Sequence, residues 1–309
     1  MKKCPFFGLC GGCAYDFTAN DYHAQKSQKL PKIENMGEPI WGIPGTRRRA
    51  DFAVAPNYFG FFKPASKDII NITNCPNILP EINEIVPNLA DLPWECAASI
   101  LVTKCDNGIV VNVSSDVPYF GPDFRNAVQK LPPQIIRFTW NQTVVRAYNK
   151  PEIVFDSTRT DFPDGAFLQP TADTEKTLRD LVVAATNGAK HVADLFCGIG
   201  NFTFATNATG FDIAGTGVNR DLFKKPLTTA QLNQYDAVIM DPPRAGAMAQ
   251  SKELAKSNVP TVVYISCNPG TWVRDKNILE RGGYSVQTVT PVDQFVGSSH
   301  WEIFSVFKK

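Results

Sequence analysis

The stretch HVADLFCGIGNF, residues 191–202, joins a short apolar run to a turn rich in glycine. An apolar run of this length, followed by glycine, predicts a strand buried inside a parallel sheet. Gly198 and Gly200 would let the backbone approach a ligand where a side chain would collide. In a doubly wound sheet, a nucleoside-type cofactor binds at the end of the first strand. Because a Gly-x-Gly turn after a strand is a weak signal by itself, a plain tight turn is the alternative.

Further apolar strands alternate with helical stretches along the C-terminal half of the chain. Residues 235–240 and 261–266 are predicted as strands, and residues 284–290 and 302–307 as a closing antiparallel pair. This alternation is typical of an α/β domain built around a parallel sheet. The pattern changes near residue 150, so we predict that residues 151–309 form the α/β domain.

The N-terminal half has a different pattern, in which turn residues and prolines are dense and no long amphipathic helix is evident. The turn sequences DNG at 106–108 and NQ at 141–142 each separate two apolar stretches, which predicts two β-hairpins. A polar helix is expected at 21–34. We therefore predict a smaller, β-rich domain over residues 1–150.

The chain has 309 residues and a net charge of +1, which fits a globular protein of about two domains. No apolar run reaches the roughly 18 residues of a membrane-spanning helix, and the N-terminus turns polar too early for a signal peptide. We expect a cytoplasmic monomer that engages no membrane. With so little net charge, RNA binding would need a local basic patch. The densest candidate is Arg47-Arg48-Arg49, for which a solvated surface turn is the alternative.

The eight cysteines are unevenly placed. A disulfide framework is not expected in a reducing compartment. Cys4, Cys10 and Cys13, with Cys75 after a long interval, supply four thiolates, enough for one tetrahedral zinc ion or one [4Fe–4S] cluster. The glycine pair between Cys10 and Cys13 offers backbone N–H groups to sulfur. The residues alone leave zinc and iron–sulfur open.

The sequence DPPRAGA, residues 241–247, follows the strand predicted at 235–240. Two prolines stiffen the exit from this strand and direct Asp241 toward the ligand-binding edge of the sheet. Enzymes that modify a base hold it in such a loop after it has been flipped out of the nucleic acid. A rival reading is an enzyme that methylates an amino group of adenine or guanine. Such enzymes usually place an aromatic residue after the prolines, where Arg244 stands here.

Cys267 follows the strand predicted at 261–266, again at the edge where ligands bind. A thiolate is needed if the target is carbon 5 of uracil, because that carbon is too weak a nucleophile to take a methyl group directly. Addition of the thiolate to C6 makes C5 carbanion-like. Glu302, at the start of the last strand, would then remove the C5 proton. The alternatives are a buried structural cysteine and a carboxylate on the rim.

Together these motifs resemble the RNA uracil-C5 methyltransferase family. The resemblance rests on FLQ (167–169), DLFCGIGNF (194–202), DPPRAGA (241–247), SCNP (266–269) and SHWE (299–302), in this order. It implies a Rossmann-like class I methyltransferase domain that uses S-adenosylmethionine. It also implies that Cys267 is the nucleophile, that Glu302 is the base and that Asp241 lies between cofactor and target base.

The resemblance further implies the ligands. Gln169, Phe196, Asn201 and Asp221 match positions that line the S-adenosylmethionine pocket in such enzymes. The four cysteines match the [4Fe–4S] site of the rRNA-modifying members, which favours iron–sulfur over zinc. The most similar type is the shorter 23S rRNA enzyme, in which residues 1–150 would carry the cluster and recognise RNA. A tRNA T-loop enzyme is the alternative.

Two departures from the family pattern concern the cofactor site. Thr171 stands where members usually have asparagine. The interval from Asp194 to Asp241 is shorter than the roughly 60 residues that three helices and two strands would need. We therefore expect one helix to be missing and the second or third strand to be lost or re-paired. Asp212, the expected ribose-binding acid, is then uncertain in its placement, and a catalytically degenerate iron–sulfur RNA-binding protein is the corresponding rival.

Overall fold

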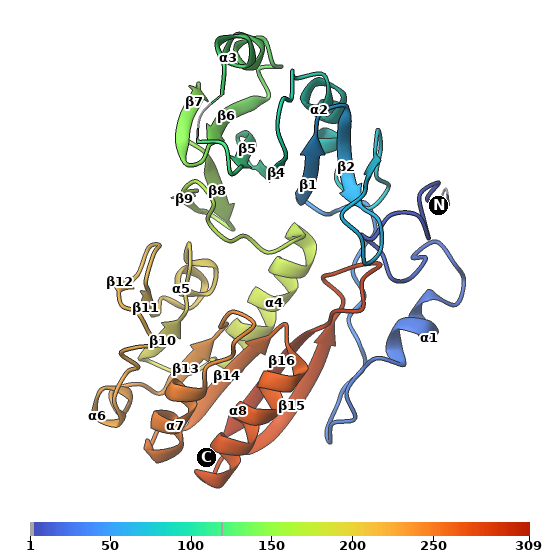
Figure 1. The fold of residues 1–309 in the computed structure, drawn as a ribbon. Helices are drawn as coiled ribbons and strands as arrows, with labels where there is room; N and C mark the ends of the chain where they lie inside the picture. The colour runs from blue at the N-terminus through green and yellow to red at the C-terminus, as the bar shows by residue number, and fades with distance from the viewer. Residues whose placement is uncertain (1–2, 119) are drawn as a thin grey trace. The chain divides into compact units, whose positions relative to one another are not determined.

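The computed structural model describes residues 3–118 and 120–309. The chain forms two compact units, each assembled from separate parts of the sequence (Figure 1). The first unit comprises Met1–Gln28, Ile43–Ala172 and Val296–Ser299, and the second comprises Lys29–Gly42, Asp173–Phe295 and His300–Lys309. Within the described ranges, no helix is both long and apolar enough to cross a lipid bilayer.

The first unit is built on a seven-stranded sheet in the order β3-β2-β1-β4-β5-β6-β7. Its strands are β1 (Arg49–Ala55), β2 (Tyr58–Phe62), β3 (Ile69–Asn71), β4 (Ala98–Cys105), β5 (Gly108–Ser114), β6 (Ile135–Trp140) and β7 (Thr143–Ala147). The β4–β5 and β6–β7 pairs are antiparallel, which confirms both predicted hairpins. A separate hairpin pairs β8 (Glu152–Phe155) with β9 (Thr158–Asp161).

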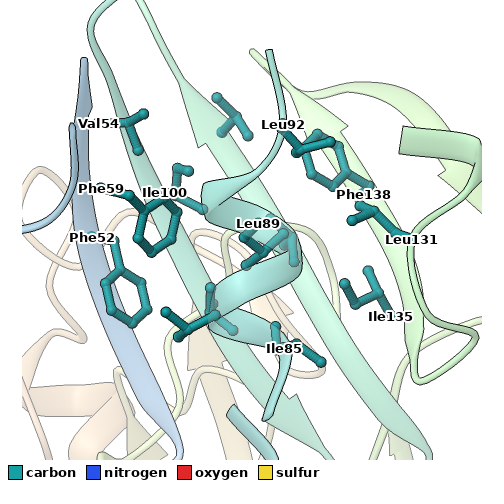
Figure 2. Packing of buried hydrophobic residues seen from close by; sticks show 14 of the residues in the cluster. Phe52, Val54, Phe59, Ile85, Leu89, Leu92, Ile100, Leu131, Ile135 and Phe138 are labelled. Carbon is teal, nitrogen blue, oxygen red and sulfur yellow. The ribbon is translucent and has the colours of Figure 1, made fainter. Parts of the chain in front are cut away.

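Two helices that the sequence pattern did not predict supply part of the core of this unit: α2 (Pro80–Ala90) and α3 (Pro122–Gln129). The expectation of no long helix here was wrong for α2, because prolines were read as loop signals. Both helices begin with proline, which is favourable in the first turn since its missing N–H has no partner there. Figure 2 shows Ile85 and Leu89 of α2 among the apolar side chains of the sheet. Burial of this apolar face stabilises the helix in spite of its internal Pro87.

The polar helix predicted at 21–34 is much shorter, because α1 spans only Tyr22–Ser27. Pro31 disfavours helical backbone in the residue before it and cannot donate a helical hydrogen bond. Beyond α1 the chain joins the second unit as extended backbone, where Met36 and Ile40 form bridges to the β15 strand.

The second unit is built on a seven-stranded sheet in the order β12-β11-β10-β13-β14-β16-β15. Its strands are β10 (Val192–Leu195), β11 (Thr209–Asp212), β12 (Val218–Asn219), β13 (Ala237–Met240), β14 (Thr261–Ser266), β15 (Ser285–Val292) and β16 (Glu302–Lys308). The first five strands in spatial order are parallel, and β16 is antiparallel to both of its neighbours. This arrangement confirms the predicted parallel α/β sheet and its closing antiparallel pair.

Helices cover both faces of the second sheet, so every residue of β13 and β14 is buried. The helices are α4 (Ala172–Ala185), α5 (Asn201–Thr206), α6 (Thr229–Leu232), α7 (Met248–Lys256) and α8 (Pro269–Arg281). Figure 1 shows α7 and α8 side by side on one face. The continuous burial explains why these strands read as unbroken apolar runs.

The edge formed by β11 and β12 is shortened. No helix lies between Asp212 and Val218, all of which the structure describes, so the predicted missing helix is confirmed. The predicted loss or re-pairing of a strand was wrong, because β12 keeps its place parallel to β11, although only two residues long. A tight turn replaces the crossover. Gly215 permits it, since a Cβ there would lie 2.0 Å from the carbonyl oxygen of Gly198.

Candidate active site

Three of the predicted site residues lie at one edge of the second sheet. Asp241 follows β13 and Cys267 follows β14, so both stand at the carboxyl ends of parallel strands, where α/β sheets bind ligands. Because β16 is antiparallel to β14, Glu302 at its first residue reaches the same edge. Ser266 pairs with Ile303, so Cys267 and Glu302 each adjoin this last pair of the β14–β16 ladder.

These three groups interact electrostatically. Glu302 is 2% exposed, and burial raises the pKa of its carboxyl well above the usual value, with the Asp241 carboxylate adding to the rise. Burial, together with the nearby Glu302 and Asp241, raises the pKa of the Cys267 thiol to about 11, and the Arg244 guanidinium opposes that rise. At neutral pH the resting site therefore holds a protonated thiol beside a carboxyl group that resists ionisation.

A buried amide completes the surroundings of Glu302. The Gln294 side chain is 1% exposed, and its Nε2 donates a hydrogen bond to Glu302 Oε2. Sequence reasoning did not single out Gln294. The available signal was a pair of polar residues, Asp293 and Gln294, directly after the apolar end of β15.

Buried polar groups hold the loop that follows Asp241 in place. The backbone N–H of Ala247 and the hydroxyl of Tyr264 both donate to Asp275 Oδ2, each at 2.7 Å. Gly246 has a φ of +72°, and a Cβ at this position would lie 2.6 Å from the same Asp275 oxygen. The sequence DPPRAGA therefore ends in glycine and alanine because the backbone must approach a buried carboxylate.

A second set of hydrogen bonds joins this loop to the one that carries Cys267. Asn268 Nδ2 donates to the carbonyl oxygen of Arg244 at 3.0 Å, and Thr271 Oγ1 donates to the same oxygen at 3.3 Å. Asn268 also caps α8 through the backbone N–H of Gly270. Arg244 Nη2 lies 3.4 Å from His300 Nε2. The two loops that would hold a substrate are thus coupled, and Asn268 is a further residue whose role the sequence alone did not reveal.

The glycine-rich turn after β10 has left-handed backbone, as expected where a ligand must come close to the main chain. Phe196, Gly198 and Gly200 have φ values of +64°, +51° and +94°. Phe196 adopts this strained conformation without being glycine, and its N–H donates to the carbonyl oxygen of Phe211 at 2.9 Å. Asn201 begins α5, and its Oδ1 accepts a hydrogen bond from Arg179 at 2.8 Å. Its buried Nδ2 has no acceptor among the described residues.

The remaining predicted cofactor residues lie in different surroundings. Asp212 ends β11, and its two carboxylate oxygens accept the N–H groups of Gly198 at 2.9 Å and Ala214 at 3.0 Å. Asp221 accepts the N–H groups of the turn that follows it. Gln169 belongs to the first unit, where its carbonyl oxygen accepts a hydrogen bond from Arg48.

The four cysteines predicted to bind a metal line one cavity of about 230 Å³ in the first unit. Burial raises the pKa of the Cys13 thiol to about 12, and Cys75, Cys10 and Cys4 each add to the rise. The N–H of Gly12 donates to Cys10 Sγ at 3.3 Å, as expected from the glycine pair. Across the described residues, no group of three or more histidine, cysteine or acidic side chains is arranged to hold a single metal ion.

The predicted basic patch at residues 47–49 is not a surface patch. Arg48 is 6% exposed, and its Nε donates to the carbonyl oxygen of Gln169 at 3.0 Å. Arg49 Nη1 donates to the carbonyl oxygen of Leu168 at 3.0 Å. Arg47 lines the cysteine cavity. The three arginines lie at and just before the start of β1, are buried or half-buried, and bind backbone carbonyl groups, so neither a basic surface patch nor a solvated turn describes them.

Comparison with known sequences identifies related proteins along the whole chain. A family model described as tRNA (Uracil-5-)-methyltransferase matches residues 219–309. The chain is 36% identical to an uncharacterized RNA methyltransferase of Mesorhizobium japonicum, over 99% of this chain and 84% of that protein. It is 27% identical to the 23S rRNA (uracil(1939)-C(5))-methyltransferase RlmD of an Enterobacter species, over 99% of this chain and 81% of that protein.

Comparison with solved structures identifies the fold. The Pyrococcus abyssi tRNA (uracil-54, C5)-methyltransferase, solved in complex with S-adenosyl-L-homocysteine, is similar with a TM-score of 0.72 at 18% identity. The match covers 92% of this chain and 81% of that chain. It confirms the predicted Rossmann-like methyltransferase fold. Since the chain is 36% identical to an RNA methyltransferase over 84% of that protein, and the matched family segment contains Cys267 and Glu302, the chain belongs to the RNA uracil-C5 methyltransferase family.

Proposed function

We propose that this protein transfers a methyl group from S-adenosylmethionine to carbon 5 of a uridine in RNA. The observation that carries the proposal is that Cys267 and Glu302 lie at neighbouring strand ends, near enough to interact electrostatically with each other and with Asp241, at the ligand-binding edge of the second sheet. A nucleophile and a base on neighbouring strands can act on two adjacent ring carbons of one pyrimidine. An enzyme that methylates exocyclic amino groups would have no use for this thiol.

The reaction needs two separate acts from the protein. The Cys267 thiol gives up its proton to solvent and its sulfur forms a bond to C6, so the electrons of the C5–C6 double bond become available at C5. S-adenosylmethionine supplies the methyl group that C5 takes up, and S-adenosylhomocysteine leaves. Glu302 then removes the C5 proton, the double bond re-forms, and the Cys267 sulfur departs as a thiolate.

The environment of the two residues suits these roles. A buried Glu302 whose pKa is raised is a stronger base than an exposed carboxylate. The Cys267 thiol has a pKa of about 11, so it is protonated at rest and becomes nucleophilic as its proton leaves. Asp241 is close enough to affect both groups, in keeping with a place between cofactor and target base.

For the cofactor we propose the glycine-rich turn and its neighbours. Gly198 and Gly200 give the backbone room to approach a nucleoside, and the buried Nδ2 of Asn201 is a donor that still needs an acceptor. The other proposed contacts are Gln169, Phe196, Asp212, Asp221 and Asp241. Asp212 can serve the ribose only with the lone pairs that its two backbone hydrogen bonds leave available.

We propose an iron–sulfur cluster, rather than zinc, for the cysteine cavity. Four thiolates could also bind one zinc ion, and the resemblance of the cysteine pattern to the rRNA-modifying members of the family favours the cluster. Cys4, Cys10, Cys13 and Cys75 all line one cavity, and a [4Fe–4S] cluster takes four cysteine thiolates as ligands. The neighbouring Arg47 would offset the negative charge of four thiolates.

As substrate we propose 23S rRNA, with the first unit recognising the RNA. Similarity over nearly the full length to an enzyme named for 23S rRNA supports this choice. The family model named for tRNA and the similar tRNA enzyme structure keep a tRNA uridine as the second candidate. Either RNA would be met in the cytoplasm. Mapping of 5-methyluridine in rRNA and tRNA from cells with and without the gene separates the two.

Trapping on RNA that contains 5-fluorouridine tests the proposed chemistry. Fluorine at C5 cannot be removed as a proton, so the enzyme should remain covalently bound to the RNA after methyl transfer. We expect a denaturant-resistant adduct with the natural protein and none with Cys267→Ala. Cys96→Ala, a half-buried cysteine of the first unit, is the matched control and should form the adduct. An adduct that persists in Cys267→Ala would overturn the mechanism.

A further inference from the structure

The contact between Gln294 and Glu302 gives the two oxygens of the Glu302 carboxyl group different surroundings. Gln294 Nε2 donates to Glu302 Oε2, and both side chains are buried. Glu302 Oε1 is also buried, yet it has no hydrogen-bond partner among the described residues. Glu302 Oε2 therefore accepts a hydrogen bond from Gln294, whereas the lone pairs of Glu302 Oε1 accept none from the described residues.

The backbone places Gln294 at this point. Val292, the last residue of β15, pairs with Glu302, the first residue of β16. The N–H of Asp293 donates to the carbonyl oxygen of Ile40 at 2.8 Å, which fixes the chain just beyond the end of the strand. Gln294 therefore follows a hydrogen-bonded residue and extends toward the carboxyl group of Glu302, which begins the neighbouring strand.

We propose that Gln294 is a positioning residue that holds Glu302 through Oε2 and thereby makes Oε1 the oxygen that accepts the proton from C5. The inference rests on the proposed function of Glu302 as the base. In the proton transfer, the C5–H bond breaks, its electrons re-form the C5–C6 double bond, and the proton ends on Oε1. Gln294 touches neither the substrate carbon nor the sulfur in this step.

The same contact keeps Glu302 able to ionise. Among the described residues, Asp241 at the end of β13 acts electrostatically on Glu302, and Glu302 in turn acts on Cys267 at the end of β14. Burial and Asp241 raise the pKa of Glu302, whereas the Gln294 hydrogen bond lowers it. A neutral donor stabilises the carboxylate without supplying a competing positive charge. Loss of this donor should therefore raise the pKa of Glu302 further and shift its use as a base to higher pH.

Gln294→Met tests the proposal, because methionine has a similar length and no N–H donor. In a single turnover with methyl-labelled S-adenosylmethionine and unmodified RNA, the methylated covalent adduct should form normally and accumulate. Its resolution to free RNA should slow roughly ten- to hundredfold, as expected for loss of a hydrogen bond to a charged group. The acid limb of the resolution rate should move to higher pH, with the Kd for RNA unchanged. Gln287→Met, the same exchange at an exposed position of β15, is the matched control.

Combination with Glu302→Gln separates positioning from general damage. Because Gln294 acts through Glu302, adding Gln294→Met to Glu302→Gln should slow resolution no further. Gln294→Asn, which is too short to reach the same oxygen, should reproduce the effect if the methionine variant fails to fold. Resolution at the natural rate and pH in a folded Gln294 variant would overturn the inference. If 5-fluorouridine RNA also gave no adduct with the natural protein, the proposed function itself would be wrong, so the two failures are distinguishable.

Discussion

Asp212 and Gly198 are joined by a hydrogen bond of 2.9 Å, in which the backbone N–H of the glycine-rich turn donates to the Asp212 carboxylate. The other oxygen of Asp212 accepts the N–H of Ala214, in the turn that replaces the missing helix. One carboxylate therefore ties the shortened edge of the sheet to the proposed cofactor site. The residue proposed to bind the ribose therefore also secures the shortened edge of the sheet.

Replacement of Asp212 should therefore affect both stability and cofactor binding. We expect Asp212→Ala to lower the free energy of unfolding by about 1–3 kcal/mol, because two backbone donors lose a charged acceptor. Calorimetry should show weaker binding of S-adenosylmethionine. Asp180→Ala, which removes only an exposed ion pair with Lys176 on α4, should change neither quantity measurably. Unchanged cofactor affinity in Asp212→Ala would exclude this region from the cofactor site.

Gly246→Ala should destabilise the loop that carries Asp241. The new Cβ would lie 2.6 Å from both Asp275 Oδ2 and Arg274 Nη2, and the backbone is left-handed at φ +72°. Gly188→Ala is a matched control, because Gly188 has a φ of +84° but no atom within 4 Å of the added Cβ. Denaturant unfolding should show a loss of about 1 kcal/mol for the control, from backbone strain alone, and a larger loss for Gly246→Ala. Equal losses would contradict the role assigned to Asp275.

Cys267 should react with alkylating reagents as a thiol of high pKa. With its pKa raised to about 11, the thiolate fraction and the alkylation rate should rise roughly tenfold per pH unit between pH 7 and 10, without a plateau. Arg244→Met should slow the reaction, because the nearby positive charge that lowers this pKa is removed. Mass spectrometry of the Cys267 peptide, with Cys267→Ala as the blank, provides the measurement. A plateau below pH 8 would show that the thiol ionises much more easily than its surroundings indicate.

Asp194 should make the stability of the protein depend on pH. It is fully buried, and burial raises the pKa of its carboxyl to about 7, from about 3.9 in an unfolded chain. Between these values the folded state keeps a proton that the unfolded state loses, so stability falls by about 1.4 kcal/mol per pH unit as pH rises. The Asp194→Asn variant has no carboxyl group here to titrate, so its stability does not fall in this way. The stability difference between variant and natural protein should thus shift in favour of the variant from pH 4 to 7 in urea unfolding, and a constant difference would refute the assignment.

Cys13→Ser should abolish the proposed cluster. Anaerobically purified natural protein should contain about four iron and four acid-labile sulfide ions per chain, and the variant should contain neither in stoichiometric amount. Cys96→Ser, which alters a cysteine outside the cavity, should retain both. The assay measures metal and sulfide content and not activity. If the natural protein instead contained about one zinc ion per chain and no sulfide, the site would be a zinc site and not a cluster.

Local sequence patterns predicted the elements that position the site. The strands before Asp241 and Cys267 are buried on both faces, so they appear as unbroken apolar runs. Hairpin turns in the first unit were equally evident, because turn chemistry is local. Helix α2 was missed, since its stability comes from packing of its apolar face and not from its proline-containing sequence. The two-residue strand β12 carries no periodic signal, so its retention beside β11 was not predictable.

The sequence by itself determined the parallel sheet, the strand ends at which Asp241, Cys267 and Glu302 lie, and membership of a methyltransferase family. These features depend on apolar periodicity and on short motifs, which neighbouring residues specify. Only the tertiary structure decided that Arg48 is buried, that Asp212 secures a shortened edge and that Gln294 holds Glu302. Each of these depends on burial or on partners that are distant in sequence. The run of arginines at 47–49 and the polar pair Asp293–Gln294 do not reveal, by themselves, which residues they contact.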